Sequence, residues 1–177
     1  ARLCRGGLGV SSVATAQSLL SLLTTDDFME ATFLLSVLGE GTFLDLLAFV
    51  ERHAPDEATA ELARRARNDE SRHVHFGLAH VRHGLARDPA LYARLESAVR
   101  RRAATLQGIG GVPAPLQDSL TLLAAGSVEP RAVSRGHDAF QELLAVMHDS
   151  RIKRLGHAGF TPEQAATLSL LHTPNFM

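Results

Sequence analysis

Apolar residues recur at helical spacing along nearly the whole chain, and no segment alternates between apolar and polar positions as a strand would. The pattern predicts a first long helix over about 27–53, which should be buried on all sides because it is apolar almost throughout 31–50. Pro55 marks a turn, and a second long helix is predicted over about 56–86. We expect these two helices to pack as an antiparallel hairpin.

The rest of the chain also reads as helix. Further helices are predicted at about 12–23, 89–106, 116–125, 130–155 and from Thr161-Pro162 onward, with a loop rich in glycine and proline near 108–115. The predicted fold class is therefore all-α. We expect a single domain over 1–177, made of a helix hairpin at 26–86 and a C-terminal helical extension at 87–177.

The amino-acid composition limits which partners and cellular locations we expect for this chain. The chain is 45% apolar and 21% charged, which is ordinary for a globular protein, and its net charge of −1 gives no reason to expect nucleic acid or an anionic membrane as partner. One cysteine excludes an internal disulfide framework and fits a reducing, cytoplasmic location. The apolar run is long enough for a membrane span, but Glu40 and Asp45 would each cost about 2.5–3.5 kcal/mol at a bilayer centre. The sequence therefore favours a buried helix and no membrane span.

Glu40 is the first candidate for chemistry. An ionised carboxylate in the middle of a buried helix is costly unless it is paired, protonated or bound to a cation. Gly39 and Gly41 flank it, although each glycine costs about 1 kcal/mol in a helix relative to alanine. Two such residues indicate that something bulky lies beside the backbone. The alternative is a close helix crossing in which an arginine pairs with Glu40.

Glu70 and His73 are the second candidates. They are three residues apart on the second long helix, so they share a face and can bind one metal ion. This short motif is weak on its own. The same face carries small or apolar residues, which predicts that it meets a partner helix and that Glu70 and His73 are buried with it; these residues are Ala63, Ala66, Gly77 and Val81.

The spacing of the three candidates around the turn is the main argument. Glu40 lies fifteen residues before Pro55 and Glu70 lies fifteen residues after it. At the rise of an α-helix, each is roughly 22 Å from the turn. An antiparallel hairpin would therefore bring two carboxylates and one imidazole to the same height.

The segment Asp69-Glu70-Ser71-Arg72-His73 resembles the D-E-x-R-H motif of the ferritin-like di-iron carboxylate proteins, a superfamily that includes the ribonucleotide reductase small subunit type and di-iron oxygenases. The upstream Glu40-Gly41-x-Phe43 resembles the glutamate helix that precedes that motif. The resemblance covers about residues 28–84. It implies a ferritin-like helical bundle that holds two iron ions, or a manganese–iron pair, and activates O₂.

The resemblance also implies roles for single residues. Glu40 would be a bridging or terminal metal ligand, Glu70 a bridging ligand and His73 a terminal ligand. Asp69 would accept a hydrogen bond from a ligand histidine, and Arg72 would pair with a buried carboxylate. The candidates for lining a substrate pocket, one turn from Glu40 on its helix, are Val37, Phe43 and Leu44.

The chain departs from the family in one respect. The family has a second glutamate and a second E-x-x-H on a preceding helix pair, and this sequence contains no other E-x-x-H. Because the chain opens with Ala1, we expect it to be the C-terminal half of a longer protein; the alternative is a degenerate member with half a site. Alone it should bind metal poorly, be inactive and expose apolar helix faces. Residues 87–177 would cover the bundle or form a homodimer contact.

The expected function is that of an O₂-activating non-haem di-iron oxidoreductase, an oxidase or monooxygenase, with a small-molecule substrate and an electron-donor protein as partners. Two alternatives remain open. One is ferritin-like iron handling without an organic substrate. The other is a non-catalytic helical interaction or ligand-binding domain, in which Glu70, Arg72 and Asp69 form a buried salt-bridge network.

Overall fold

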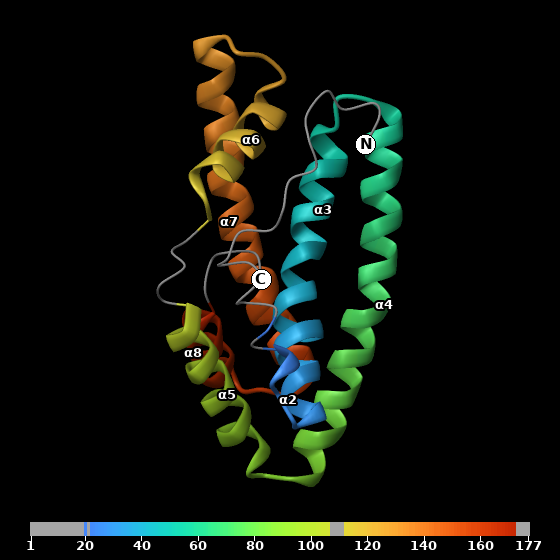
Figure 1. The fold of residues 1–177 in the computed structure, drawn as a ribbon, viewed down its shortest axis with the longest axis vertical. Coiled ribbons are helices and arrows are strands. Elements are labelled where there is room, and N and C mark those ends of the chain that lie inside the picture. The colour runs from blue at the N-terminus through green and yellow to red at the C-terminus, as the bar shows by residue number, and fades with distance from the viewer. Residues whose placement is uncertain (1–19, 21, 107–111, 173–177) are drawn as a thin grey trace.

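A computed structural model of the chain describes residues 20, 22–106 and 112–172. Within these residues every regular element is a helix, so the all-α prediction is confirmed (Figure 1). The helix predicted over 12–23 lies largely outside the described residues. The elements are α2 (Phe28–Thr32), η1 (Phe33–Glu40), α3 (Gly41–His53), α4 (Glu57–Arg87), α5 (Leu91–Leu106), α6 (Ala114–Ala125), α7 (Pro130–Ala158) and α8 (Pro162–Leu171).

The helix ends lie close to where the sequence predicts them, because capping residues mark them. The Asp27 carboxylate accepts hydrogen bonds from the first backbone N–H groups of α2, and Asp56 accepts one from the Thr59 N–H at 2.7 Å. Thr161 and Gln164 form a capping box at the start of α8. α7 ends at Ala158 and is capped by Gly159, whose φ of 102° is accessible to glycine at little cost.

α2, η1 and α3 join end to end into one continuous helix, Phe28–His53, which we call the first long helix. After a short turn α4 runs back beside it, so the predicted antiparallel hairpin is present (Figure 1). By length and composition alone the first long helix could cross a membrane. In the fold it is the central helix, packed against α4 on one side and α7 on the other.

The middle of the first long helix differs from the prediction of a regular α-helix. Residues Phe33–Glu40 form a π-helix, in which each N–H bonds to the carbonyl five residues back. The wider turn changes the direction in which later side chains project. π-Helical turns are rare and occur frequently at functional sites, and this one ends at Glu40.

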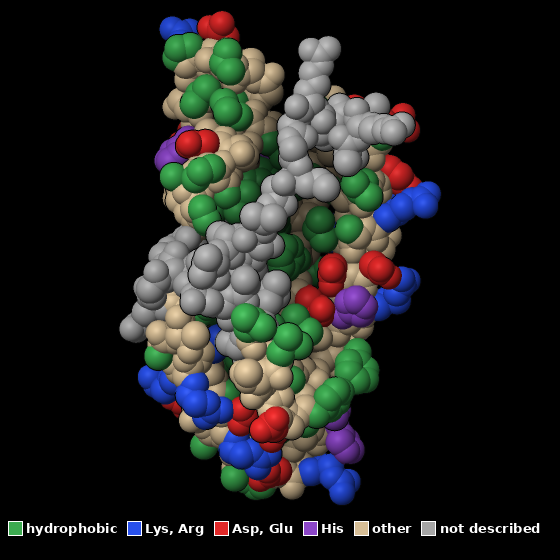
Figure 2. Space-filling view, in the orientation of Figure 1, with side chains coloured by type: hydrophobic (Ala, Val, Ile, Leu, Met, Phe, Trp, Pro, Cys, Tyr) green, Lys and Arg blue, Asp and Glu red, His purple; other side chains and the backbone are tan. Residues whose placement is uncertain are grey.

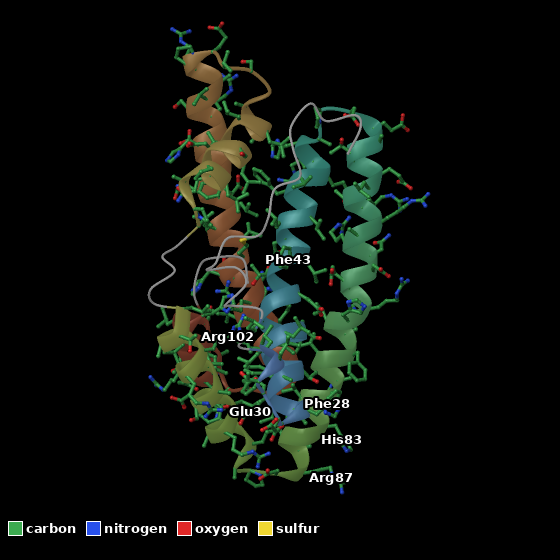
Figure 3. All side chains as sticks on the ribbon, viewed as in Figure 1. Phe28, Glu30, Phe43, His83, Arg87 and Arg102 are labelled. Carbon is green, nitrogen blue, oxygen red and sulfur yellow. The ribbon has the colours of Figure 1, made fainter. Side chains whose placement is uncertain are left out.

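The C-terminal helices cover one side of the hairpin. α7 runs along α3, α6 packs on α7, and α8 folds back between α7 and α5 (Figure 1). Side chains fill the space between these helices, as the stick view in Figure 3 shows. The described residues that follow α4, up to 106 and from 112 to 172, therefore form part of the same packed body as the hairpin.

Two apolar clusters hold this body together. The larger one lies where the first half of the first long helix meets α4, α5, α7 and α8, and its least exposed large members are Phe33, Leu38, Val81, Leu91, Leu95, Leu155 and Leu168. The second lies between α3, α6 and α7 and is centred on Phe49, Leu120, Phe140, Leu143 and Met147. From α4 the two clusters include only Leu78, Val81 and Leu85, which lie C-terminal to the middle of that helix.

The two arms of the hairpin approach each other closely at Gly77. A methyl group added there would lie 2.8 Å from Ser36 Cβ and 3.3 Å from Val37 Cγ2, both closer than ordinary contact. Gly77 lies one turn beyond His73 on α4, so this contact sets how near α4 comes to the π-helix. The sequence predicted that the face of α4 carrying small residues meets a partner helix, and the contact at Gly77 confirms this.

We predict that Gly77→Ala lowers the free energy of unfolding by about 1–3 kcal/mol, because the added methyl must push α4 away from the π-helix. The matched control is Gly156→Ala on α7, where a methyl group would meet nothing within 4 Å. That exposed helical position should become more stable by up to about 1 kcal/mol. Urea unfolding followed by circular dichroism measures both, and equal effects of the two substitutions would contradict the close approach.

Candidate metal centre

Glu40, Glu70 and His73 come together in the structure. One carboxylate oxygen from each glutamate and one ring nitrogen of the histidine all lie within 4.8 Å of one another. Glu40 ends the π-helix, while Glu70 and His73 lie one turn apart in the middle of α4. This arrangement agrees with the register expected from the equal distances to Pro55. Acidic and histidine side chains gather at the middle of this side of the molecule (Figure 2).

The contacts within the cluster leave one carboxylate oxygen without a donor. His73 Nδ1 lies 3.2 Å from Glu70 Oε2 and 3.7 Å from Glu40 Oε1. Glu40 Oε2 is buried and has no hydrogen-bond partner among the described residues. A buried oxygen with negative charge and no donor is unfavourable in a closed protein interior. A cation beside it would remove that cost.

The expected burial of Glu70 and His73 is wrong for this chain. The Glu40 side chain is 19% exposed, but those of Glu70 and His73 are 33% and 55% exposed. The reason is the arrangement of the helices: α7 covers the first long helix from the opposite side, and no described helix covers this face of α4. The cluster therefore opens to solvent on one side.

Asp69 and Arg72 lie on the solvent side of the cluster. They pair with each other, and their side chains are 62% and 76% exposed. Arg72 therefore does not pair with a buried carboxylate, and His73 Nδ1 faces Glu70 instead of Asp69. The hydrogen bond expected from a ligand histidine to Asp69 stays a prediction. Both residues point away from the hairpin because they lie on the solvent side of α4. The same exposure rules out a buried network of Glu70, Arg72 and Asp69.

The three substrate-lining candidates are not equivalent. Val37 is 1% exposed and packs in the larger apolar cluster, where its Cγ2 faces Gly77. Phe43 and Leu44 are half-buried on α3, just beyond Glu40 (Figure 3). Val37 thus supports the helix crossing under the cluster, and only Phe43 and Leu44 are open enough to meet a small molecule.

An arginine does approach the backbone beside Glu40, but it has a different partner. A methyl group at Gly41 would lie 2.8 Å from Arg154 Nε, so the guanidinium would have to shift to make room for a larger residue. Arg154 Nη1 donates to Asp45 Oδ2 at 3.2 Å. The close crossing proposed as an alternative is therefore present, and its ion pair is formed by Asp45 instead of Glu40.

This ion pair belongs to a basic interior that the sequence analysis missed. Arg151 is 7% exposed, and burial lowers its pKa to about 10, with Arg154 nearby acting in the same direction. The His172 ring lies 3.5 Å from Thr42 Oγ1, and burial together with the surrounding arginines lowers its pKa to about 3. No local spacing reveals such a cluster, because its members come from α3, α7 and the end of α8.

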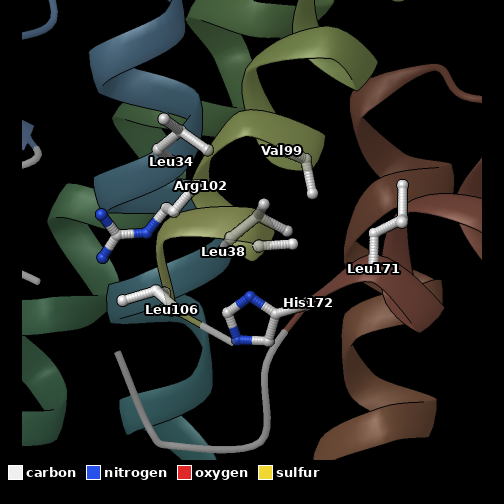
Figure 4. A pocket seen from close by; sticks show the side chains of 8 residues that line it. Leu34, Leu38, Val99, Arg102, Leu106, Leu171 and His172 are labelled. Atoms are coloured by element: carbon white, nitrogen blue, oxygen red, sulfur yellow. The ribbon is translucent and has the colours of Figure 1, made fainter. Parts of the chain in front are cut away.

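A small cavity adjoins His172 (Figure 4). Its volume of about 10 Å³ has room for roughly one water molecule, so it does not accommodate an organic substrate. It is lined by Leu34, Leu38, Val99, Arg102, Ala103, Leu106, Leu171 and His172.

No protein-family model, curated protein or solved structure matches this chain. What the structure itself defines is an all-α protein whose central hairpin presents two glutamates and one histidine at a common point.

We predict that Asp45→Ala lowers the free energy of unfolding by about 3 kcal/mol, because it leaves Arg151 and Arg154 buried without a counter-charge. The matched control is Asp69→Ala, which breaks an exposed aspartate–arginine pair and should cost less than about 1 kcal/mol. Denaturant titrations of both variants test the difference, and similar losses would show that Asp45 carries no special role.

The depressed pKa of His172 predicts a pH dependence of stability. Below pH 6.5 the unfolded chain protonates this histidine while the folded protein keeps it neutral until about pH 3. Stability should therefore fall with decreasing pH in this window, by about 1.4 kcal/mol per pH unit for a full proton. His172→Gln should lose this component, whereas His157→Gln, an exposed control, should keep it. Unfolding free energies at several pH values between 5 and 7.5 measure it.

Proposed function

We propose that the chain supplies one half of a di-iron carboxylate centre in an O₂-activating, ferritin-like oxidoreductase acting on a small molecule. The observation that carries the proposal is the convergence of Glu40, Glu70 and His73 from two helices, with one buried glutamate oxygen left without a donor. The resemblance of 69–73 to the D-E-x-R-H motif supports the same function. The rest of the centre requires a second set of ligands.

The donor set fits the metals that this chemistry uses. Carboxylate oxygens and an imidazole nitrogen suit Fe(II), Mn(II) and Zn(II), while soft metals prefer thiolates. With neutral histidine the cluster carries a charge of −2, which one divalent cation balances. Bound iron would supply the electrons that reduce O₂ and the oxidising power directed at the substrate.

The residues of the chain have distinct tasks in this proposal. Glu40, held by the π-helix and nearly buried, offers a carboxylate whose position is fixed by packing. Glu70 and His73 offer their atoms from the more open side, where an ion and a substrate can enter. The apolar cluster beneath them, which includes Val37, excludes water from the inner side of the site.

A second interpretation of the Glu40, Glu70 and His73 cluster requires no metal ion. His73 Nδ1 lies within 3.7 Å of a carboxylate oxygen of each glutamate, and the imidazole would bridge them as a surface ion pair. Such pairs contribute little to stability when they are exposed. In this interpretation the chain is a non-catalytic helical domain. A measurement of metal binding distinguishes it from the metal-centre proposal.

The test is an anaerobic titration of the purified chain with Fe(II), followed by exposure to air. Because this chain alone provides three protein ligands, we expect weak but saturable binding of about one iron per chain. Binding should bring thermal stabilisation that a chelator reverses, and a near-ultraviolet absorption band after oxidation. Glu70→Gln should lower iron affinity at least tenfold. Glu61→Gln, on the same helix but paired with Arg64 and Arg65, should leave it unchanged.

If iron binds with no preference for the wild type over Glu70→Gln, or if it does not bind at all, the metal proposal is wrong and the surface ion pair remains. Iron uptake with slow air oxidation but no turnover of organic substrates would favour iron handling over oxygenation.

A further inference from the structure

The surface around the candidate ligands is unusual for a helix exposed to water. The side chains of Leu62 and Phe76 on α4 are 69% and 57% exposed, and Phe28 on the first long helix is 64% exposed. Leu62, His73 and His80 are separated by eleven and seven residues, which places them on one face of α4. Figure 2 shows apolar side chains on both sides of the acidic and histidine group. We call this surface the ligand face.

Part of the ligand face is already ordered. Phe76 stacks on His80 with ring centres 5.9 Å apart and planes at 5°, and Phe28 meets the same imidazole edge-on at 5.3 Å. Three rings are therefore fixed against each other at the surface just below the metal ligands. Preordered aromatic groups lose little entropy when a partner covers them, and they are typical of the centres of protein interfaces.

The number of protein ligands on the ligand face is small for a centre with two metal ions. The chain gives one site three protein ligands, two carboxylates and one imidazole. A two-fold axis through the ligand face would bring a second identical set, for a total of four carboxylates and two imidazoles. The charge of −4 on this set would be balanced by two divalent cations. A dimer about a two-fold axis uses the same patch on both chains, so a self-complementary ligand set is what such an interface requires.

We propose that a second copy of this chain docks on the ligand face, so that two hairpins form a four-helix bundle with two metal ions related by its two-fold axis. This inference rests on the proposed function, because the metal ions supply the charge that holds the acidic centres together. The apolar residues, namely Leu62, Phe76 and Phe28, would be covered by their equivalents or by the facing hairpin. Without cations the four carboxylates repel one another, so assembly depends on the metal.

The test is sedimentation velocity of the full chain in the presence of a chelator and then with Mn(II) or anaerobic Fe(II). We expect a monomer with chelator and a dimer with one metal ion per chain after addition of metal. Phe76→Glu should weaken the metal-dependent dimer at least tenfold while leaving the three ligands in place. Leu122→Glu, a comparably exposed leucine on α6 away from the ligand face, should dimerise as the wild type does.

The outcomes separate this inference from the proposed function. Metal bound by a chain that remains monomeric overturns the dimer and leaves the half-site standing. If the dimer forms equally well in chelator, or if Phe76→Glu does not weaken it, the proposed metal-dependent interface is wrong. No metal binding in any state overturns both proposals.

Discussion

The close packing of the first long helix against α4 is the constraint on which the rest of this structure depends. At Gly77 the two helices approach so closely that a single methyl group would not fit without movement. This contact fixes the distance between the end of the π-helix and the middle of α4, and therefore the separation of Glu40 from Glu70 and His73. The candidate metal centre is a result of helix packing more than of any loop.

The two sides of the first long helix have different electrostatic character. On the α7 side, Asp45 pairs with Arg154, and Arg151 lies buried nearby. On the α4 side, Glu40 faces a second glutamate and a histidine, and has an oxygen without a donor. The positive side is closed by packing, while the negative side is open to solvent. An open acidic site is accessible to a cation, and this asymmetry is the physical basis of the function we propose.

The sequence predicted the parts of this arrangement that depend on local rules. Helix ends followed from capping residues such as Asp56 and Thr161, and the register of the hairpin followed from equal distances to Pro55. The π-helix was not predictable, because the hydrogen-bond shift arises from packing and changes no residue pattern. The pairing of Arg154 with Asp45 joins residues 109 positions apart and has no local signal. The exposure of His73 was missed because periodicity identifies an apolar face but cannot show whether a partner helix is present.

The position of the first long helix in the chain has a consequence for biosynthesis. Its 26 residues are hydrophobic enough to resemble a membrane span, and they emerge from the ribosome before either helix that flanks them. α4 follows directly and can pair with it early, but α7 begins only at Pro130. For the time that ribosomes take to add the intervening segment, one apolar side of this helix stays uncovered. Nascent chains in that state are the ones that chaperones bind and that aggregate when chaperones are scarce.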